Sequence, residues 1–126
     1  AHRLVAKADE FDVVVMPNLY GDILSDAAAG LVGGLGLAPS ACIGKDYAYF
    51  EPAHGTAPDI AGQGIVNPTA TLMSAAMMLE YLGDKANAKR INSAIDTAYA
   101  QQNSLTPDQG GTASTMQFAE SLLSLI

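Results

Sequence analysis

Residues 18–26 read Asn-Leu-Tyr-Gly-Asp-Ile-Leu-Ser-Asp, and residues 51–62 read Glu-Pro-Ala-His-Gly-Thr-Ala-Pro-Asp-Ile-Ala-Gly. The first stretch places Asp22 and Asp26 one helical turn apart, so that both carboxylates share a face. The second stretch is a loop stiffened by proline that carries an imidazole between two acids. Together the two stretches indicate a divalent metal ion beside a nucleotide, which favours a redox enzyme.

Composition narrows the possible functions. The chain of 126 residues suits one ordinary domain, and it carries 13 acids against 6 bases for a net charge of −7. Because no basic face is available to neutralise phosphates, we reject nucleic-acid binding. The longest strongly apolar run, around Leu72 to Leu82, is too short to span a bilayer, so we expect no membrane association. The first residue is Ala1 rather than Met, which leaves open that this is a piece of a longer chain.

The single cysteine, Cys42, excludes an internal disulfide. This fits a reducing compartment, and we expect a cytoplasmic protein, or one of the mitochondrial matrix if the source is eukaryotic. Since Cys42 lies in an apolar run, we expect its thiol to be buried and inert.

The first half of the chain predicts an alternation of helices and strands. Residues 1–8 resemble the end of a helix, and the β-branched run 11–16 predicts a parallel strand buried on both faces. Asn18 is a plausible N-cap for a helix that continues to about Val32. Residues 38–43 and 48–50 predict two further strands, and 51–66 predicts a long irregular loop of the kind that is usually functional.

The second half predicts three helices. Asn67 and Pro68 suit the start of a helix over 69–82, which is apolar on nearly every side and should therefore be central and buried. Gly83 should end it, and Asp84 should cap the next helix, whose apolar stripe is Ala88, Ile91, Ile95 and Ala98. After a turn over 106–111, the residues 114–117 match a capping box for a last helix with the stripe Phe118, Leu122 and Leu125.

The carboxylate pair has two interpretations. By spacing alone, Asp22 and Asp26 are more simply explained as a solvated helix face. Their neighbours Ile23, Leu24 and Leu31 are apolar, however, so the helix should be largely buried, where unpaired acids are costly. We therefore expect Asp22 and Asp26 to bind a hard divalent cation, Mg²⁺ or Mn²⁺.

Gly34-Leu35-Gly36 does not match a dinucleotide fingerprint, because Pro39 replaces the third glycine and a strand follows. The loop that follows Glu51 is a better nucleotide site. Gly55 permits close backbone approach, and Asp59 could accept hydrogen bonds from both ribose hydroxyls while repelling a 2′-phosphate, which favours NAD over NADP.

Each of these loop residues also has a simpler explanation. His54 either contacts the cofactor or braces the loop, and Asp59 could be a local turn-former. Asn67 could be only a helix cap, or could both cap the helix and touch adenine. Glu51 could lie near the nicotinamide, or could be a solvated acid at the end of a strand.

The two stretches resemble the decarboxylating β-hydroxyacid dehydrogenases, which act on isocitrate, 3-isopropylmalate, homoisocitrate or tartrate. The resemblance extends over 18–26, 33–40, 51–62, Asn67-Pro68-Thr69, Pro107-Asp108 and Gly110-Gly111, and so covers nearly the whole chain in order. It implies an α/β, non-Rossmann three-layer sandwich of which only the carboxy-terminal part is present. Residues 1–33 would end the smaller, dimer-interface domain, and 34–126 would form the C-terminal half of the larger, cofactor-binding domain.

The resemblance also assigns residues. It implies Asp22 and Asp26 as metal ligands and an NAD site that includes Glu51, His54, Gly55, Thr56, Ala57, Asp59, Ile60, Asn67 and Asp108. Family members that use NADP typically carry Lys-Tyr where this chain has Asp59-Ile60, which supports NAD. The substrate-binding arginines, the catalytic tyrosine and lysine, and a third metal-binding aspartate would all lie upstream, so no catalytic residue is expected in this chain.

The implied reaction is hydride transfer from a 2-hydroxy polycarboxylate to NAD, with metal-assisted loss of CO₂. The segments 18–23 and 29–36 look like the NAD-isocitrate branch, so isocitrate is preferred over the other three substrates. Alternatives from another class are a non-catalytic, nucleotide-binding regulatory subunit or an isolated module. We expect this chain alone to be inactive and to self-associate through exposed apolar surface, and the complete protein to be a homodimer or higher oligomer.

Overall fold

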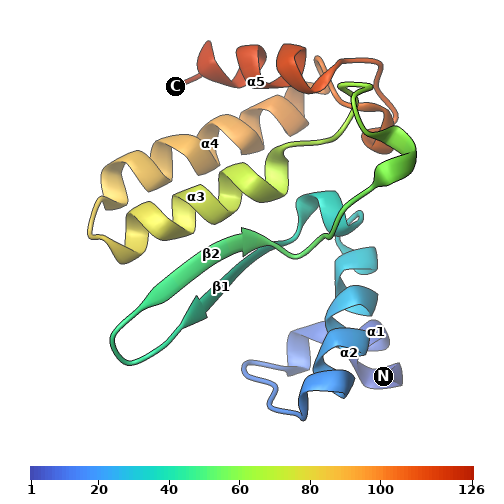
Figure 1. Ribbon diagram of the computed structural model, residues 1–126, viewed down its shortest axis with the longest axis vertical. Coiled ribbons are helices and arrows are strands. Elements are labelled where there is room, and N and C mark those ends of the chain that lie inside the picture. The colour runs from blue at the N-terminus through green and yellow to red at the C-terminus, as the bar shows by residue number, and fades with distance from the viewer.

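The computed structural model describes residues 1–126. It begins with a small helical unit, which lies apart from the other helices at the lower right of Figure 1. This unit contains α1 (His2–Ala6), a 3-10 turn over Ala8–Glu10, and α2 (Asn18–Leu31), and α1 packs on α2. No helix of the chain is both long and apolar enough to cross a membrane.

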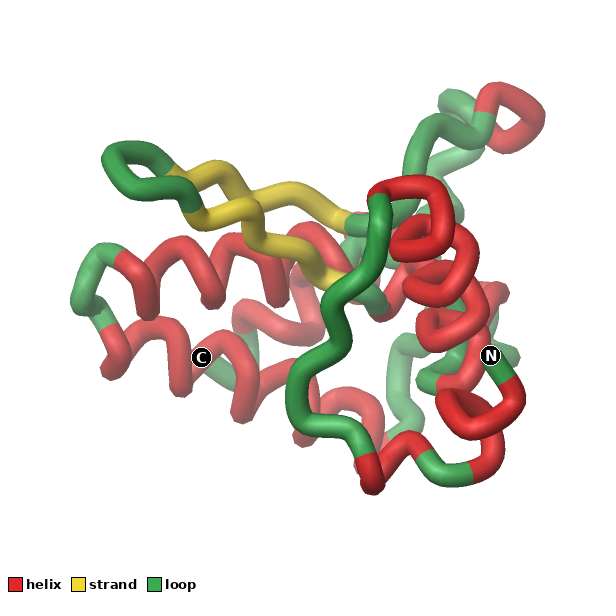
Figure 2. Tube along the Cα trace, turned by 90° about the horizontal axis from the view of Figure 1, so that it is seen from below, coloured by secondary structure: helices red, strands yellow, loops and turns green.

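A β-hairpin follows the helical unit. Strands β1 (Pro39–Ile43) and β2 (Ala48–Pro52) pair antiparallel, with Cys42 opposite Tyr49, and a tight turn joins them where Gly44 N donates to Tyr47 O at 2.8 Å. Both predicted strands are therefore confirmed. The hairpin packs along one side of α3 (Thr69–Tyr81), as Figures 1 and 2 show.

Helix α3 is central in this part of the molecule, as its apolar composition predicts. It packs on the hairpin and on α4 (Lys85–Gln101), and Ala70, Ser74 and Ala76 are buried between them. Gly83 follows the C-cap residue of α3 and turns the chain with a φ of 93°, a conformation that suits a residue without a side chain. The predicted cap of α4 is confirmed, since the Asp84 carboxylate accepts a hydrogen bond from Asn87 N at 3.1 Å.

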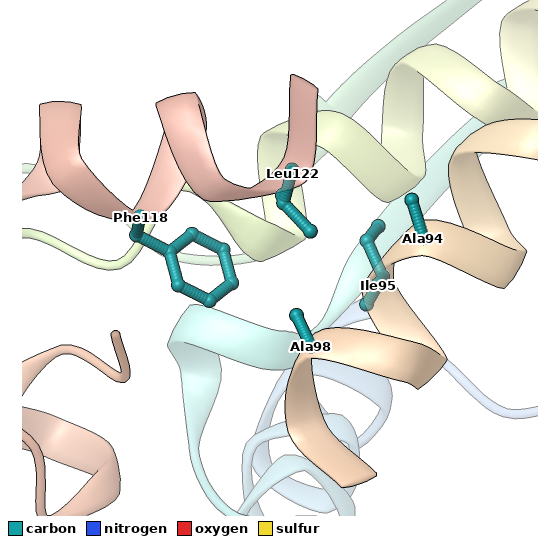
Figure 3. Packing of buried hydrophobic residues seen from close by; sticks show 5 residues of the cluster. All are labelled: Ala94, Ile95, Ala98, Phe118 and Leu122. Carbon is teal, nitrogen blue, oxygen red and sulfur yellow. The ribbon is translucent and has the colours of Figure 1, made fainter. Parts of the chain in front are cut away.

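The main apolar core lies between α4 and α5 (Thr115–Leu123). Phe118 and Leu122 of α5 pack against Ala94, Ile95 and Ala98 of α4 (Figure 3). The predicted capping box is also confirmed, because Ser114 Oγ accepts from Gln117 N at 3.2 Å while Gln117 Oε1 accepts from Ser114 N at 2.8 Å. The core and the cap together fix where α5 begins, beside the loop that carries the candidate site.

The prediction of a buried strand over 11–16 is wrong for this chain. The segment has no regular secondary structure, and Val13 and Val15 are 78% and 90% exposed. The expectation that α2 is largely buried is also wrong, because Ala29 is its only buried residue and Leu19 and Ile23 are exposed. Apolar composition shows that a surface favours burial, but burial also needs a partner element, which these 126 residues do not supply.

Two local expectations also fail. Asn18 is the first residue of α2, with Pro17 preceding it, and no side chain caps this helix. Cys42 is exposed rather than buried, because it lies near the end of β1, in the part of the hairpin that extends beyond its buried segment. Exposed large apolar residues elsewhere, such as Tyr47 and Leu82, leave much of the chain's apolar surface in contact with solvent.

Candidate functional site

A cavity of about 570 Å³ lies between the loop after β2, the start of α3 and a 3-10 turn over Pro107–Gln109. Its lining comes from three segments that are far apart in sequence, residues 35–36, 54–67 and 107–108. Seven of the nine residues predicted for a nucleotide site line the cavity: His54, Gly55, Thr56, Ala57, Ile60, Asn67 and Asp108. Most of the predicted site thus forms one hollow in the fold.

The other two predicted residues lie outside the lining. Glu51 is exposed on β2, and its carbonyl oxygen accepts a hydrogen bond from Ser74 Oγ at 2.9 Å. Asp59 is exposed in a short 3-10 turn, where its carbonyl accepts from Gln63 Nε2 at 3.0 Å. Both side chains face solvent and make no hydrogen bond to the cavity residues.

Sequence reasoning missed five lining residues: Leu35, Gly36, Ile65, Val66 and Pro107. Gly36 belongs to the glycine run that does not match a dinucleotide fingerprint, yet it reaches the cavity from another direction. A β-carbon on Gly36 would lie 3.5 Å from Asp108 Oδ2, so the glycine passes close to that carboxylate. The glycine run was the one sequence feature that could have indicated Gly36 as a lining residue. Which residues it approaches, however, is decided only by the tertiary structure.

The side chains of Asn67 and Asp108 form the polar wall of the cavity. Asn67, which is 4% exposed, donates from Nδ2 to Asp108 Oδ2 at 3.0 Å, and its Oδ1 accepts from Thr69 N at 3.0 Å. The amide therefore holds both the first residue of α3 and the carboxylate, although the N-cap position of α3 is Pro68 and not Asn67 as predicted. Thr106 Oγ1 donates to Asp108 Oδ1 at 2.6 Å, and Gln109 Nε2 donates to Asp108 Oδ2 at 3.1 Å.

These hydrogen bonds keep Asp108 charged. Partial burial alone would raise the pKa of Asp108, but hydrogen bonds from Thr106, Asn67 and Gln109 outweigh it and hold the pKa below its usual value. The cavity consequently presents a fixed negative charge at neutral pH. Such a group accepts hydrogen bonds from a ligand's N–H or O–H donors and repels anionic groups.

One ring nitrogen of His54 has no hydrogen-bond partner in the wall of the cavity. Its Nδ1 lies 3.0 Å from Gly55 O, which accepts a hydrogen bond from the tautomer that carries hydrogen on Nδ1. Its Nε2 is buried and has no hydrogen-bond partner. Buried polar atoms in proteins are nearly always paired, so an unpaired ring nitrogen in the wall of a cavity indicates a place for a ligand atom. The other ring nitrogen braces the loop, as one of the two interpretations expects, and contact of His54 with a cofactor stays a prediction.

The end of the loop is anchored by α5. Thr115 Oγ1 donates to Val66 O at 2.5 Å, and Thr115 N donates to Gly64 O at 2.7 Å. The first turn of α5 therefore holds the loop end against the cavity. Gln109 Nε2 also donates to Gly33 O at 3.2 Å, which connects the turn carrying Asp108 to the end of α2.

Asp22 and Asp26 lie on α2, four residues apart and both exposed. Neither side chain forms an ion pair, and Ser25 Oγ donates to the backbone oxygen of Asp22 at 3.0 Å. Two carboxylates are suitable ligands for Mg²⁺ or Mn²⁺. The chain contains no group of three acidic, histidine or cysteine side chains that could hold a metal ion, so this pair would be an incomplete ligand set.

Comparison with known proteins identifies the family. The model of the isocitrate/isopropylmalate dehydrogenase family matches residues 1–122. The chain belongs to this family. It is 58% identical over 123 residues to the isocitrate/homoisocitrate dehydrogenase of Thermus thermophilus, which covers 98% of this chain and 36% of that protein. It is 55% identical over 116 residues to the probable mitochondrial NAD isocitrate dehydrogenase subunit alpha of Caenorhabditis elegans.

Solved structures of the isocitrate/isopropylmalate dehydrogenase family agree. The isocitrate dehydrogenase from Methylococcus capsulatus superposes with a TM-score of 0.93 at 48% identity, over 98% of this chain and 37% of that one. The chain thus spans about a third of the length of the relatives it matches. These matches confirm the predicted α/β fold class and show that this chain corresponds to one part of such a fold.

Proposed function

We propose that the complete protein is an NAD-dependent oxidative decarboxylase of a 2-hydroxy polycarboxylate, with isocitrate as the preferred substrate. Within it, residues 34–126 would supply the adenosine side of the cofactor site, and Asp22 and Asp26 would supply two metal ligands. The observation that carries this proposal is the cavity in which His54, Asn67 and Asp108 come together.

The cavity residues fit the adenosine part of NAD. Gly55 to Ala57 bring backbone to the cavity wall, the unpaired His54 Nε2 can take a hydrogen bond, and Ile60 and Val66 offer apolar surface to a purine ring. The Asp108 carboxylate can accept a hydrogen bond from an exocyclic amine. NAD, when bound, accepts the hydride, while the chain's own residues bind and orient its adenosine end.

The choice of NAD over NADP rests on Asp59. Its exposed carboxylate, on the loop that lines the cavity, would repel a 2′-phosphate and accept hydrogen bonds from the free ribose hydroxyls. The names of the relatives from mitochondria, which are NAD isocitrate dehydrogenase subunits, support the same cofactor.

The metal proposal rests on the donor chemistry of Asp22 and Asp26. Two hard oxygen ligands on one face of an exposed helix suit Mg²⁺ or Mn²⁺, which would lower the pKa of a bound hydroxyl group. The remaining ligands, and the acid and base of the reaction, would come from other parts of the complete protein. This chain alone is therefore expected to be inactive.

The substrate is proposed from the relatives' names and the branch-like segments 18–23 and 29–36. Isocitrate/homoisocitrate dehydrogenase and 3-isopropylmalate/3-methylmalate dehydrogenase are similarly close, at 58% and 55% identity. 3-Isopropylmalate, homoisocitrate and tartrate are therefore the alternative substrates. A non-catalytic regulatory subunit is the alternative of another class, and the retention of both Asp22 and Asp26 argues against it.

We further propose that residues 1–33 belong to the smaller domain and that the complete protein is a homodimer or larger oligomer. The exposed apolar segment over 11–16 and the exposed face of α2 support this, because such surface is usually covered in the functional protein. A cytoplasmic or mitochondrial matrix location and the absence of nucleic-acid or membrane partners also belong to this proposal.

The test is a substrate and cofactor matrix on the complete purified protein. Isocitrate, homoisocitrate, 3-isopropylmalate and tartrate are each combined with NAD or NADP, with Mg²⁺ or with a chelator, and formation of reduced nicotinamide and CO₂ is followed. We expect the highest kcat/KM with isocitrate, NAD and Mg²⁺. Faster turnover of 3-isopropylmalate would reassign the substrate, and nucleotide binding without any turnover would favour the regulatory subunit.

A further inference from the structure

The hydroxyl of Tyr99 contacts the wall of the cavity from behind. Tyr99 lies on α4 and does not line the cavity, but its Oη is 3.0 Å from Asn67 Nδ2 and 2.9 Å from Thr69 Oγ1. Asn67 and Thr69 are 4% and 1% exposed, so their partner on this side is the phenol and not bulk solvent. Tyr99 belongs to none of the sequence motifs that point to the site.

Counting protons fixes the orientation of the Asn67 amide. One Nδ2 proton goes to Tyr99 Oη and the other to Asp108 Oδ2, while Oδ1 accepts from Thr69 N. Because Tyr99 Oη accepts from Asn67, the phenol can donate its own proton to Thr69 Oγ1. The amide therefore has no free donor, and each of its bonds depends on the others.

The ring of Tyr99 is itself held by the core. It packs at a tilt of 59° against Phe118, with ring centroids 5.9 Å apart, and Phe118 is fully buried. Phe118 belongs to the cluster between α4 and α5 that Figure 3 shows. The position of the Tyr99 hydroxyl is therefore set by the core and not by the loop around the cavity.

We propose that Tyr99 is a positioning residue for nucleotide binding, whose hydroxyl holds the Asn67 amide so that it in turn orients the Asp108 carboxylate toward the ligand. Without the hydroxyl, a buried N–H of Asn67 and the hydroxyl of Thr69 lose their partner. Asn67 can recover one only by rotating away from Asp108, which moves the charge that the ligand meets. This inference rests on the proposed function of the cavity as an adenosine site.

The test uses the complete protein and adenosine 5′-monophosphate as the probe, with affinity measured by calorimetry below the onset of unfolding. Tyr99→Phe keeps the ring on Phe118 and removes only the hydroxyl, and we expect roughly tenfold weaker binding. Tyr81→Phe is the matched control, because it removes a hydroxyl that makes no hydrogen bond at the far end of α3, next to Phe50. We expect unchanged affinity there.

A second variant separates positioning from general loss of stability. Thr69→Val removes an equally buried hydroxyl but keeps the backbone N–H for Asn67 and leaves the bond between Tyr99 and Asn67 in place. We expect a lower melting temperature with nearly unchanged affinity, and if Tyr99→Phe does not fold, a roughly tenfold loss of affinity in Thr69→Val would still contradict the inference. Full affinity in Tyr99→Phe, or an equal loss of affinity in Thr69→Val, would overturn this inference alone. A wild-type protein that binds neither the monophosphate nor NAD would remove the proposed function as well.

Discussion

Asn67 Nδ2 donates a hydrogen bond of 3.0 Å to Asp108 Oδ2, across a separation of 41 residues in the chain. This bond joins the start of α3 to the turn before α5, and both of its ends line the same cavity. Because Asn67 is buried and its amide is saturated, the geometry of the cavity wall depends on this contact.

Asp108 should make the stability of the fold depend on pH. A carboxyl whose pKa is lower in the folded state than its ordinary 3.8 stabilises the fold above that value, and this contribution is lost as the pH falls through the lowered pKa. Urea unfolding of the wild type and of Asp108→Asn should therefore differ at pH 7, and the difference should shrink as the pH falls below 3.8. Asp96→Asn, which removes an exposed acid of α4, is the control of equal charge. A gap between wild type and Asp108→Asn that does not change with pH would contradict the assignment.

Asp22 and Asp26 should be needed for turnover but not for folding. In the complete protein, Asp22→Asn combined with Asp26→Asn should lower kcat/KM by about 100-fold or more and raise the Mg²⁺ concentration needed for half activity. Since both side chains are exposed and unpaired here, the melting temperature of this chain should hardly change. Asp46→Asn on the hairpin turn serves as the control of equal charge. Full activity with an unchanged need for Mg²⁺ would remove the metal site.

Asp59 should set the preference between the two nicotinamide cofactors. Asp59→Lys with Ile60→Tyr removes the charge that repels a 2′-phosphate and supplies one that attracts it. We expect the ratio of kcat/KM for NADP to that for NAD to rise about 100-fold, which corresponds to about 2.7 kcal/mol. The comparison is Asp46→Lys, which changes the net charge equally but lies on the hairpin turn. A similar rise in that control would point to net charge rather than to the site.

Gly111 should tolerate no side chain. A β-carbon there would lie 1.8 Å from Leu105 O, and that oxygen is held by Ala113 N at 2.9 Å. Gly111→Ala should therefore displace the turn that carries Asp108, cost more than about 3 kcal/mol in the free energy of unfolding, and abolish nucleotide binding. In Gly30→Ala, where nothing lies within 4 Å, we expect a change within about 1 kcal/mol by chemical denaturation. Comparable stability of the two variants would show that the turn can move.

Local chemistry accounts for the parts of the fold that were predicted correctly. The cap of α4 by Asp84 and the capping box at Ser114 involve residues three positions apart, so the sequence contains both partners of each bond. The two strands of the hairpin and the loop that follows them were likewise predicted, because each is a continuous segment of the sequence. Sequence motifs likewise named seven of the residues that line the cavity, because they come from continuous segments.

Sequence alone therefore determined the family, the order of most elements and the polar residues of the cavity, since these follow from local hydrogen bonding and from long motifs. Tertiary structure alone decided that Val13, Ile23 and Cys42 are exposed in this chain, because burial is a relation to a partner surface and not a property of a residue. It alone also placed Gly36 beside Asp108 and the Tyr99 hydroxyl behind Asn67, because hydrogen bonds and contacts between distant segments arise only when packing has brought those segments together.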